Sequence, residues 1–265
     1  MSQKPTEVLF AEERREEIVR LINERGKVLV PELTAYFNVS PATVRSDLRD
    51  LESLGRIKRT HGGAIPGDPV KVGYEPATRS KQVQRLAEKR AIAREAAALV
   101  EDGDILILDT GTTLQEMARM LGGKKDLTVI VNDLEIALLL EAFEGVTVIV
   151  IGGVLRKEFG CTVGPFATAM LSGLSVDKVF LGTNAFNAAK GATTPDINQA
   201  EVKKRMLEAA DRAYLLCDSG KLGKNAFVPF AGCEDLHVVI TDSGVDPLMA
   251  KELTDSGIEL RIAGL

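Results

Sequence analysis

The sequence predicts an α/β protein in two parts, an N-terminal winged helix-turn-helix and a C-terminal open α/β sheet. Three observations support this fold class. Three helical patterns and a hairpin pattern fill the first 65 residues. From residue 81 onward, continuous apolar runs alternate with helical patterns, which is typical of a parallel sheet with crossover helices. Residues 66–80 contain prolines and glycines without periodicity, so we expect domains over 1–65 and 81–265 joined by a linker.

The N-terminal part is expected to contain three short helices that share one core. Apolar residues recur at helical spacing in the first two, at Ile18, Leu21, Ile22, Leu33 and Phe37. Gly and Pro mark where these helices end or begin. The expected elements are a helix at 11–25 ending at Gly26, a β-prone run at 28–30, a helix starting at Pro31, a turn at 38–39, a helix from Pro41 to about 54 ending at Gly55, and a hairpin that pairs 57–60 with 64–65.

The third helix has the pattern of a helix that reads DNA. Ser40 is an N-cap candidate, and Pro41 suits the first helical position because its missing N–H costs nothing there. One face is apolar, with Val44, Leu48, Leu51 and Leu54. The other face carries short polar and cationic side chains near the helix N-terminus, namely Thr43, Arg45, Ser46 and Arg49. A recognition helix presents this end to base edges.

The hairpin after this helix is basic. The Gly62-Gly63 turn is flanked by Lys58, Arg59 and His61. These are the residues with which a wing would contact the DNA backbone. An ordinary amphipathic helix followed by a surface hairpin is the alternative. The combination of a preceding helix, a short turn, a capped third helix and a basic wing favours binding to double-stranded DNA, with Ser40 and the polar face of the third helix in the interface.

The C-terminal part is predicted to begin with one long helix at 81–100. Seven strand-like runs follow, at 105–108, 128–131, 147–151, 178–181, 213–217, 238–241 and 259–262. The run 105–108 is continuously apolar, as expected for a parallel strand buried on both faces. Helical patterns lie near 113–121, 134–143, 165–172, 199–210 and 247–255.

Charge and composition restrict the class of protein. The net charge is −5, but residues 1–64 hold eleven basic and ten acidic residues, so this part is +1 and the remainder −6. A mildly basic element on an acidic body suits a protein that touches DNA with one domain. Three cysteines lack metal-ligand spacing, and neither a signal segment nor a membrane-length apolar run is present. We therefore expect a cytoplasmic protein without cofactor or metal.

Four loops follow predicted strands, where ligands bind in open α/β sheets. After 105–108 comes Asp109-Thr110-Gly111-Thr112-Thr113, a Gly and hydroxyl residues that open a helix and are suited to a phosphate. Gly152-Gly153, Gly182-Thr183-Asn184 and Asp218-Ser219-Gly220-Lys221 follow later strands, and Lys221 offers a cation. Each has an ordinary explanation as a turn, a cap or a surface charge. Four such loops on one sheet edge favour a ligand site.

These motifs resemble the DeoR family of transcriptional regulators over nearly the whole chain. The N-terminal match comprises Arg15, Ile18, Ile22, the Ser-x-x-Thr-aliphatic-Arg-x-Asp-Leu core at 40–48, Leu51-Glu52, Gly55 and the Arg-Thr-His-Gly-Gly-Ala segment at 59–64. The C-terminal match comprises Lys89, Ile92-Ala93, Ala96, the Asp-x-Gly-Thr-Thr at 109–113, Gly152-Gly153, Gly191, 193–196, 201–203, Asp218 and Lys221. Ser46 departs from the Arg or Lys common in the family, and Gly220 departs from the usual Ser.

The resemblance implies a C-terminal domain similar in fold to ribose-5-phosphate isomerase that senses phosphorylated sugars. It implies that Gly111, Thr112 and Thr113 hold the phosphate, while Asp109, Asn184 and Lys221 face the sugar. We expect a repressor of a sugar or sugar-alcohol operon, bound to operator DNA and controlled by a small phosphorylated sugar. An operator with paired half-sites requires two DNA-binding domains, so a homo-oligomer (a dimer or tetramer) is expected. We expect the helix at 81–100 to help to form it.

The competing hypothesis is a sugar-phosphate isomerase with an accessory DNA-binding domain. Enolisation needs a carboxylate that moves a proton between adjacent carbons. The isomerases resembled here carry acidic residues after the strand that matches 178–181, whereas residues 182–187 contain none. Asp109 remains as a possible base, and the sequence favours a regulator over an enzyme.

Overall fold

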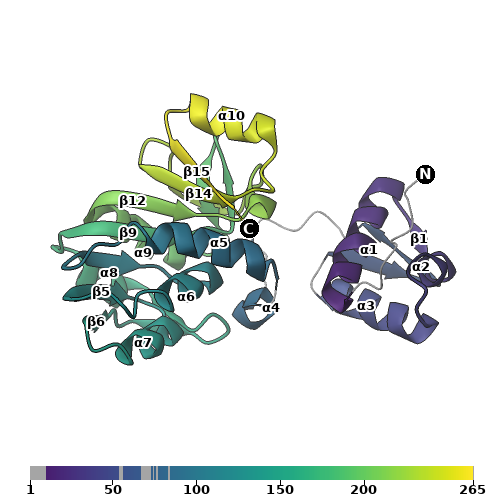
Figure 1. Ribbon diagram of the computed structural model, residues 1–265, viewed down its shortest axis with the longest axis horizontal. Coiled ribbons are helices and arrows are strands. Elements are labelled where there is room, and N and C mark those ends of the chain that lie inside the picture. Colours follow the sequence, from purple (N-terminus) through teal and green to yellow (C-terminus); the bar gives the residue numbers. More distant parts are fainter. Residues whose placement is uncertain are drawn as a thin grey trace. The chain divides into compact units, whose positions relative to one another are not determined.

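Two units make up the chain, Met1–Lys71 and Val72–Leu265 (Figure 1). The computed structural model describes residues 10–53, 56–66, 73, 75, 77–82 and 84–264.

The first unit contains three helices and a three-stranded antiparallel sheet. The helices are α1 (Ala11–Arg25), α2 (Val30–Phe37) and α3 (Pro41–Ser53), and the strands β1 (Val28–Leu29), β2 (Ile57–Thr60) and β3 (Gly63–Pro66) pair in the order β1-β3-β2. The predicted hairpin is confirmed by the pairing of β2 with β3. Helix α1 ends at Gly26, whose φ of 70° is left-handed as the predicted stop requires. Helix α2 begins one residue before the predicted Pro31.

Helix α3 follows the sequence prediction closely. The Ser40 hydroxyl accepts a hydrogen bond from the Thr43 backbone N–H at 3.1 Å, which is the predicted N-cap. The predicted inner face is buried against α1 and α2, with Ile18, Ile22, Leu33, Val44, Leu48 and Leu51 all at most 1% exposed. The remaining predicted core position, Leu54, and the predicted stop, Gly55, lie outside the described residues. The winged helix-turn-helix is therefore held by one shared core.

A seven-stranded parallel sheet forms the centre of the second unit. Its strands are β4 (Ile105–Leu108), β5 (Leu127–Val131), β6 (Val146–Val150), β9 (Val176–Gly182), β12 (Ala210–Leu216), β14 (Val238–Asp242) and β15 (Glu259–Ala263), in the order β15-β14-β12-β9-β4-β5-β6. All seven predicted runs are strands of this sheet. After β4, the chain adds β5 and β6 on one side, and then returns to add β9 and later strands on the other. The carboxyl ends of β4 and β9 thus meet at the reversal of strand order, where open α/β sheets bind ligands.

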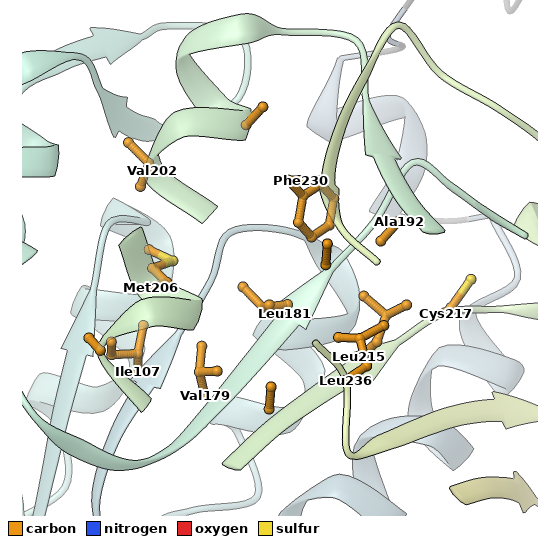
Figure 2. Packing of buried hydrophobic residues seen from close by; sticks show 14 of the residues in the cluster. Ile107, Val179, Leu181, Ala192, Val202, Met206, Leu215, Cys217, Phe230 and Leu236 are labelled. Carbon is orange, nitrogen blue, oxygen red and sulfur yellow. The ribbon is translucent and has the colours of Figure 1, made fainter. Parts of the chain in front are cut away.

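Helices cover both faces of the sheet (Figure 1). Side chains alternate across β4, because Leu106 and Leu108 join one core while Ile107 joins the other. The first core is completed by α5 (Leu86–Ala97), α6 (Thr112–Ala118) and α7 (Leu134–Glu141), and the second by α8 (Pro165–Leu171), α9 (Ile197–Glu208) and α10 (Pro247–Asp255). Figure 2 shows part of the second core, with Ile107, Val179, Leu181 and Leu215 from the strands and Val202 and Met206 from α9. Only Ile105 of the β4 run is exposed.

Short strands missed by the sequence patterns flank this sheet. They form a hairpin of β7 (Val154–Arg156) with β8 (Cys161–Val163), and a small sheet of β10 (Ala185–Asn187), β11 (Gly191–Thr194) and β13 (Val228–Ala231). Three or four residues are too few for an alternating pattern to stand out. A 3-10 turn, η1 (Ser219–Lys221), follows β12.

The prediction of one helix over 81–100 is wrong. Helix α4 (Thr78–Gln82) is separate from α5, which begins after Arg85 in the left-handed region at φ 52°. A non-glycine residue with this φ interrupts a helix and needs support from its surroundings. The Arg85 guanidinium supplies it, because it donates to the Ser219 hydroxyl at 2.7 Å and to the Asp242 carboxylate at 3.2 Å. Contacts with the ends of β12 and β14 therefore hold the break in place.

Candidate functional site

The outward face of α3 is free to meet another molecule. Arg45, Ser46 and Arg49 are exposed, and Thr43 is partly exposed. Within the described part of the chain, the side chains of Arg45 and Arg49 form no hydrogen bond or ion pair. Cations without internal partners on one helix face are suited to bind phosphates and base edges.

The wing presents Lys58 and His61 in the same way, exposed and without partners among the described residues. Arg59 differs. Its backbone N–H donates to Glu52 of α3 at 2.9 Å, and its guanidinium lies 3.6 Å from the same carboxylate. Both side chains are about 40% exposed, so the pair is weak and a phosphate can replace it. Of the three predicted wing residues, Arg59 is thus the one that also ties the wing to α3.

Sequence reasoning missed the role of Asp47 in positioning α3. Asp47 is 2% exposed and accepts from Arg14 of α1 at 2.6 and 3.2 Å and from Arg15 at 3.2 Å. Arg15 also bonds Asp50 at 2.5 Å. Position 47 lies in the apolar stripe 44, 47, 48 and 51, so its carboxylate had to be buried and needed a cation. This spacing was the available signal.

In the second unit, the loops after β4 and β9 contact each other. The Asp109 backbone N–H donates to the Phe180 carbonyl at 3.1 Å. The Gly182 N–H donates to the Asp109 carboxylate at 2.9 Å. Two of the predicted loops, 109–113 and 182–184, therefore come together at the reversal of strand order.

Asp109 is fully buried and forms an ion pair with Lys203 of α9. The ammonium of Lys203 also donates to the Gly182 carbonyl at 2.9 Å. Among the described residues, the second carboxylate oxygen of Asp109, Oδ1, has no hydrogen-bond partner. This oxygen is therefore a buried acceptor that no described donor satisfies. Lys203 was not predicted as a site residue, although it lies in the buried stripe 199, 203 and 206 of its helix.

The predicted phosphate loop is held from behind by Asp133, which follows β5. The Asp133 carboxylate caps α7 and accepts from the Thr110 hydroxyl at 2.7 Å and the Gly111 N–H at 3.3 Å. Burial raises the pKa of Asp133 despite these hydrogen bonds. Gly111 has a φ of 129°, which favours glycine, and α6 begins without a side-chain cap. The first-turn amide groups at Thr112 and Thr113 are therefore not capped by a side chain.

Lys221 lies next to the β9 loop, because its ammonium donates to the Thr183 carbonyl at 2.8 Å and lies 3.5 Å from Asp218. It also influences a neighbouring cation. The pKa of Lys89 on α5 falls to about 8, mainly through burial and next through the positive charge of Lys221. Cations gathered closely enough to affect one another are suited to a negatively charged ligand.

Asn184 joins a group of charged residues that the sequence did not indicate. Its side-chain amide donates to Glu75 at 3.0 Å, and the same carboxylate accepts from Lys81 at 2.8 Å and Arg156 at 3.1 Å. These contacts place α4 and the β7–β8 hairpin beside the loop after β9.

Gly152 and Gly153 follow β6, two strands away from β4. Gly153 has a φ of 150°, and a Cβ there would lie 2.6 Å from the Val163 carbonyl oxygen. Close packing against β8 thus accounts for this glycine. A Cβ on Gly152 would meet only the Met170 sulfur, at 3.5 Å. Among the described residues, neither glycine hydrogen-bonds to the other predicted ligand residues.

Among the described residues, no helix is both long and apolar enough to cross a membrane. The same residues contain no group of three or more His, Cys, Asp or Glu side chains placed to hold a metal ion.

Comparison with known proteins matches both units. Residues 14–69 match the family described as DeoR-like helix-turn-helix domain, and residues 84–243 the DeoR C terminal sensor domain. The HTH-type transcriptional regulator GlpR of Haloferax volcanii is 37% identical, covering 93% of this chain and 95% of the relative. Transcriptional repressor AccR of Agrobacterium fabrum is 33% identical, covering 88% and 90%.

Among solved structures, ribose 5-phosphate isomerase A from Methanocaldococcus jannaschii is similar over 51% of this chain and 53% of its own, with 21% identity and a TM-score of 0.36. The two family matches and the relatives show that this chain belongs to the DeoR family of helix-turn-helix transcriptional regulators, with a DeoR C-terminal sensor domain.

Proposed function

We propose that this regulator represses a sugar or sugar-alcohol operon and that a phosphorylated sugar bound to the second unit controls its affinity for operator DNA. The observation that carries the proposal is the group of polar and cationic residues at the carboxyl ends of β4, β9 and β12. Asp109, Asn184 and Lys221 come from these three strand ends. This edge of the sheet is where an anionic sugar would be bound.

In the proposed DNA complex, α3 enters the major groove with Thr43, Arg45, Ser46 and Arg49 toward the bases and nearby phosphates. Ser40 lies at the start of the same helix. Lys58, Arg59 and His61 contact the DNA backbone from the wing. Phosphate contacts position a protein and base contacts specify sequence, so α3 determines the operator and the wing adds affinity.

In the proposed effector complex, Gly111, Thr112 and Thr113 contact the phosphate, while Asp109, Asn184 and Lys221 contact the sugar. The unpartnered Oδ1 of Asp109 supports this, because a buried acceptor without a partner is suited to a sugar hydroxyl. Gly152 and Gly153 border this edge from β6, and their contribution is to shape the loop. The effector changes DNA binding only if it binds one arrangement of the protein more tightly than the other.

We further propose a homo-oligomer, a dimer or tetramer, because operators with paired half-sites require two reading heads about one helical turn apart. Sedimentation of the full chain with and without operator tests this. A monomer under both conditions would contradict it.

The isomerase alternative is not retained. The DeoR family consists of transcriptional regulators and not of enzymes. The one candidate base, Asp109, is also engaged by Lys203 and the Gly182 N–H.

Thermal unfolding of the full chain, measured with and without each member of a panel of sugar phosphates, tests the proposed effector class. A ligand at a hundredfold excess over its Kd adds about 2.7 kcal/mol of stability. Lys221→Ala should reduce that gain. Lys224→Ala, three residues later and exposed, should keep it. No stabilisation by any phosphorylated sugar would refute the proposed effector class.

Operator binding is tested with a duplex selected by the wild-type protein from random sequences. Arg45→Ala should weaken binding about fivefold or more, since a base contact contributes about 1–3 kcal/mol. Lys204→Ala, an exposed lysine of α9, removes the same charge from the second unit and should bind normally. If both variants bind equally well, α3 does not read the operator.

A further inference from the structure

The carboxylate of Glu75 is enclosed by donors from three separate elements. One oxygen accepts from the Lys81 ammonium of α4 at 2.8 Å and from the Asn184 amide after β9 at 3.0 Å. The other accepts from the Arg156 guanidinium of β7 at 3.1 Å. The Glu75 side chain is 8% exposed. Burial opposes its charge, but Lys81, Asn184 and Arg156 lower the pKa of Glu75 below its usual range, so it is an anion at neutral pH.

The donors around Glu75 are held by contacts that do not involve Glu75. Arg156 donates to the Gln199 side chain at 2.9 Å, lies 3.7 Å from Asp196 and stacks over the Phe159 ring with its guanidinium carbon 4.0 Å from the ring centre. Lys81 also lies over Phe159, at 5.5 Å. The Asn184 backbone N–H donates to the Thr193 carbonyl at 3.3 Å. An ammonium, a guanidinium and an amide in a prepared arrangement form a seat for an anion.

This anion seat, defined by Lys81, Arg156 and Asn184, adjoins the proposed effector site. Asn184 belongs to both. Lys221 is also near, since its positive charge contributes to lowering the pKa of Lys81, after burial and against the opposing effect of Glu75. A ligand that engages Asn184 therefore competes directly with Glu75. A phosphoryl group has more charge and more acceptor oxygens than a carboxylate, so it is a strong competitor.

We propose that the anion seat binds a second phosphoryl group of the effector, apart from the phosphate at the start of α6, and that Glu75 occupies the seat until the effector displaces it. The inference rests on the proposed function and adds the means by which the site is connected to the DNA-binding unit. Glu75 is four residues after Lys71, the last residue of the first unit. Thr78 is also held, because its N–H and hydroxyl donate to the carbonyls of Glu158 and Phe159 at 3.2 and 3.4 Å. Release of Glu75 removes one of the contacts that hold this part of the chain to the second unit.

Calorimetric titration with inorganic phosphate tests the seat. Glu75→Gln removes the competing charge and should bind phosphate about tenfold more tightly than wild type. Glu158→Gln is the matched control, because this exposed carboxylate lies two residues from Arg156 and, among the described residues, forms no hydrogen bond or ion pair with the seat residues. It should leave phosphate affinity unchanged. Adding Arg156→Gln to Glu75→Gln should abolish the gain.

Equal or weaker phosphate binding by folded Glu75→Gln would overturn the seat. So would a result in which Thr112→Val weakens phosphate binding while Arg156→Gln does not, because inorganic phosphate would then bind only at the start of α6. Hydrogen exchange of the wild type gives a test that needs no variant. Phosphate should speed exchange of the Thr78 amide severalfold, whereas unchanged or slower exchange would contradict displacement of Glu75.

The same data separate this inference from the proposed function. If a sugar phosphate stabilises the wild type but Glu75→Gln gains no affinity for phosphate, the seat is refuted and the effector class stands. If Glu75→Gln gains affinity while no sugar phosphate stabilises the wild type, the seat is supported and the effector class is refuted.

Discussion

Replacing Asp47 by alanine should selectively weaken the DNA-binding unit. Asp47 is 2% exposed and accepts three hydrogen bonds from two arginines of α1. Breaking a buried ion pair by removing one partner costs about 3–5 kcal/mol. Arg15 is 31% exposed, so water solvates it after the change, and about 3 kcal/mol is expected. A unit of about 70 residues has only about 4–11 kcal/mol of stability, so this loss is large.

The neighbouring Asp50 provides the control. It bonds Arg15 at 2.5 Å, but its side chain is 42% exposed. An exposed ion pair contributes about 0–1 kcal/mol, so Asp50→Ala should have little effect. The two aspartates lie on the same helix, three residues apart, and share a partner. Burial is therefore the main difference between the two substitutions.

Native-state hydrogen exchange on the full chain measures each unit separately. Because 1.36 kcal/mol corresponds to a factor of ten, Asp47→Ala should speed exchange of the α3 amides about 100-fold. Asp50→Ala should speed it about fivefold at most, and amides of β9 should not change in either variant. Equal effects of the two substitutions on α3 would refute the view that the buried pair positions this helix.

Three further outcomes follow from buried groups and close packing in the second unit. The pKa of Lys89 is lowered to about 8, so between pH 8 and about 10.5 the unfolded chain binds more protons than the folded chain. The free energy of unfolding should therefore rise with pH across this range, compared with that of Lys89→Met, and thermal melts at several pH values measure this difference. Gly153→Ala should lower the melting temperature clearly, because its Cβ meets a backbone oxygen at 2.6 Å, whereas Gly152→Ala should be nearly neutral. Lys203→Met should lower the free energy of unfolding in urea by about 3–5 kcal/mol, because it leaves Asp109 buried without its cation. Adding Asp109→Asn to Lys203→Met should recover part of the loss. Equal stability of this double variant and Lys203→Met would contradict the ion pair between Lys203 and Asp109.

Features with a local physical origin were predictable from the sequence. The Ser40 cap, the buried stripe of α3 and the left-handed stop at Gly26 depend on residues within a few positions of each other. Inner strands such as β4, β5 and β14 were predictable because strands buried on both faces are continuously apolar. The four loops after these strands then followed from the rule that ligands bind at strand carboxyl ends.

Contacts between distant residues were not predictable. Glu75 and Asn184 are separated by 109 positions, and Lys203 and Asp109 by 94, so no spacing rule connects them. The break at Arg85 was missed for the same reason. Its sequence neighbours favour a continuous helix, and the left-handed backbone is supported by Ser219 and Asp242, more than 130 positions away.

The order of residues in the proposed effector site has a consequence for protein synthesis. The winged helix is complete by about residue 71, whereas the site also needs residues 109, 184 and 221. At about 5–20 residues per second, roughly 8–30 s pass between the translation of Lys71 and that of Lys221. During this interval the nascent chain carries a DNA-reading head without a finished sensor. A chain truncated in this interval would keep the helix-turn-helix but would lack Lys221 of the proposed effector site.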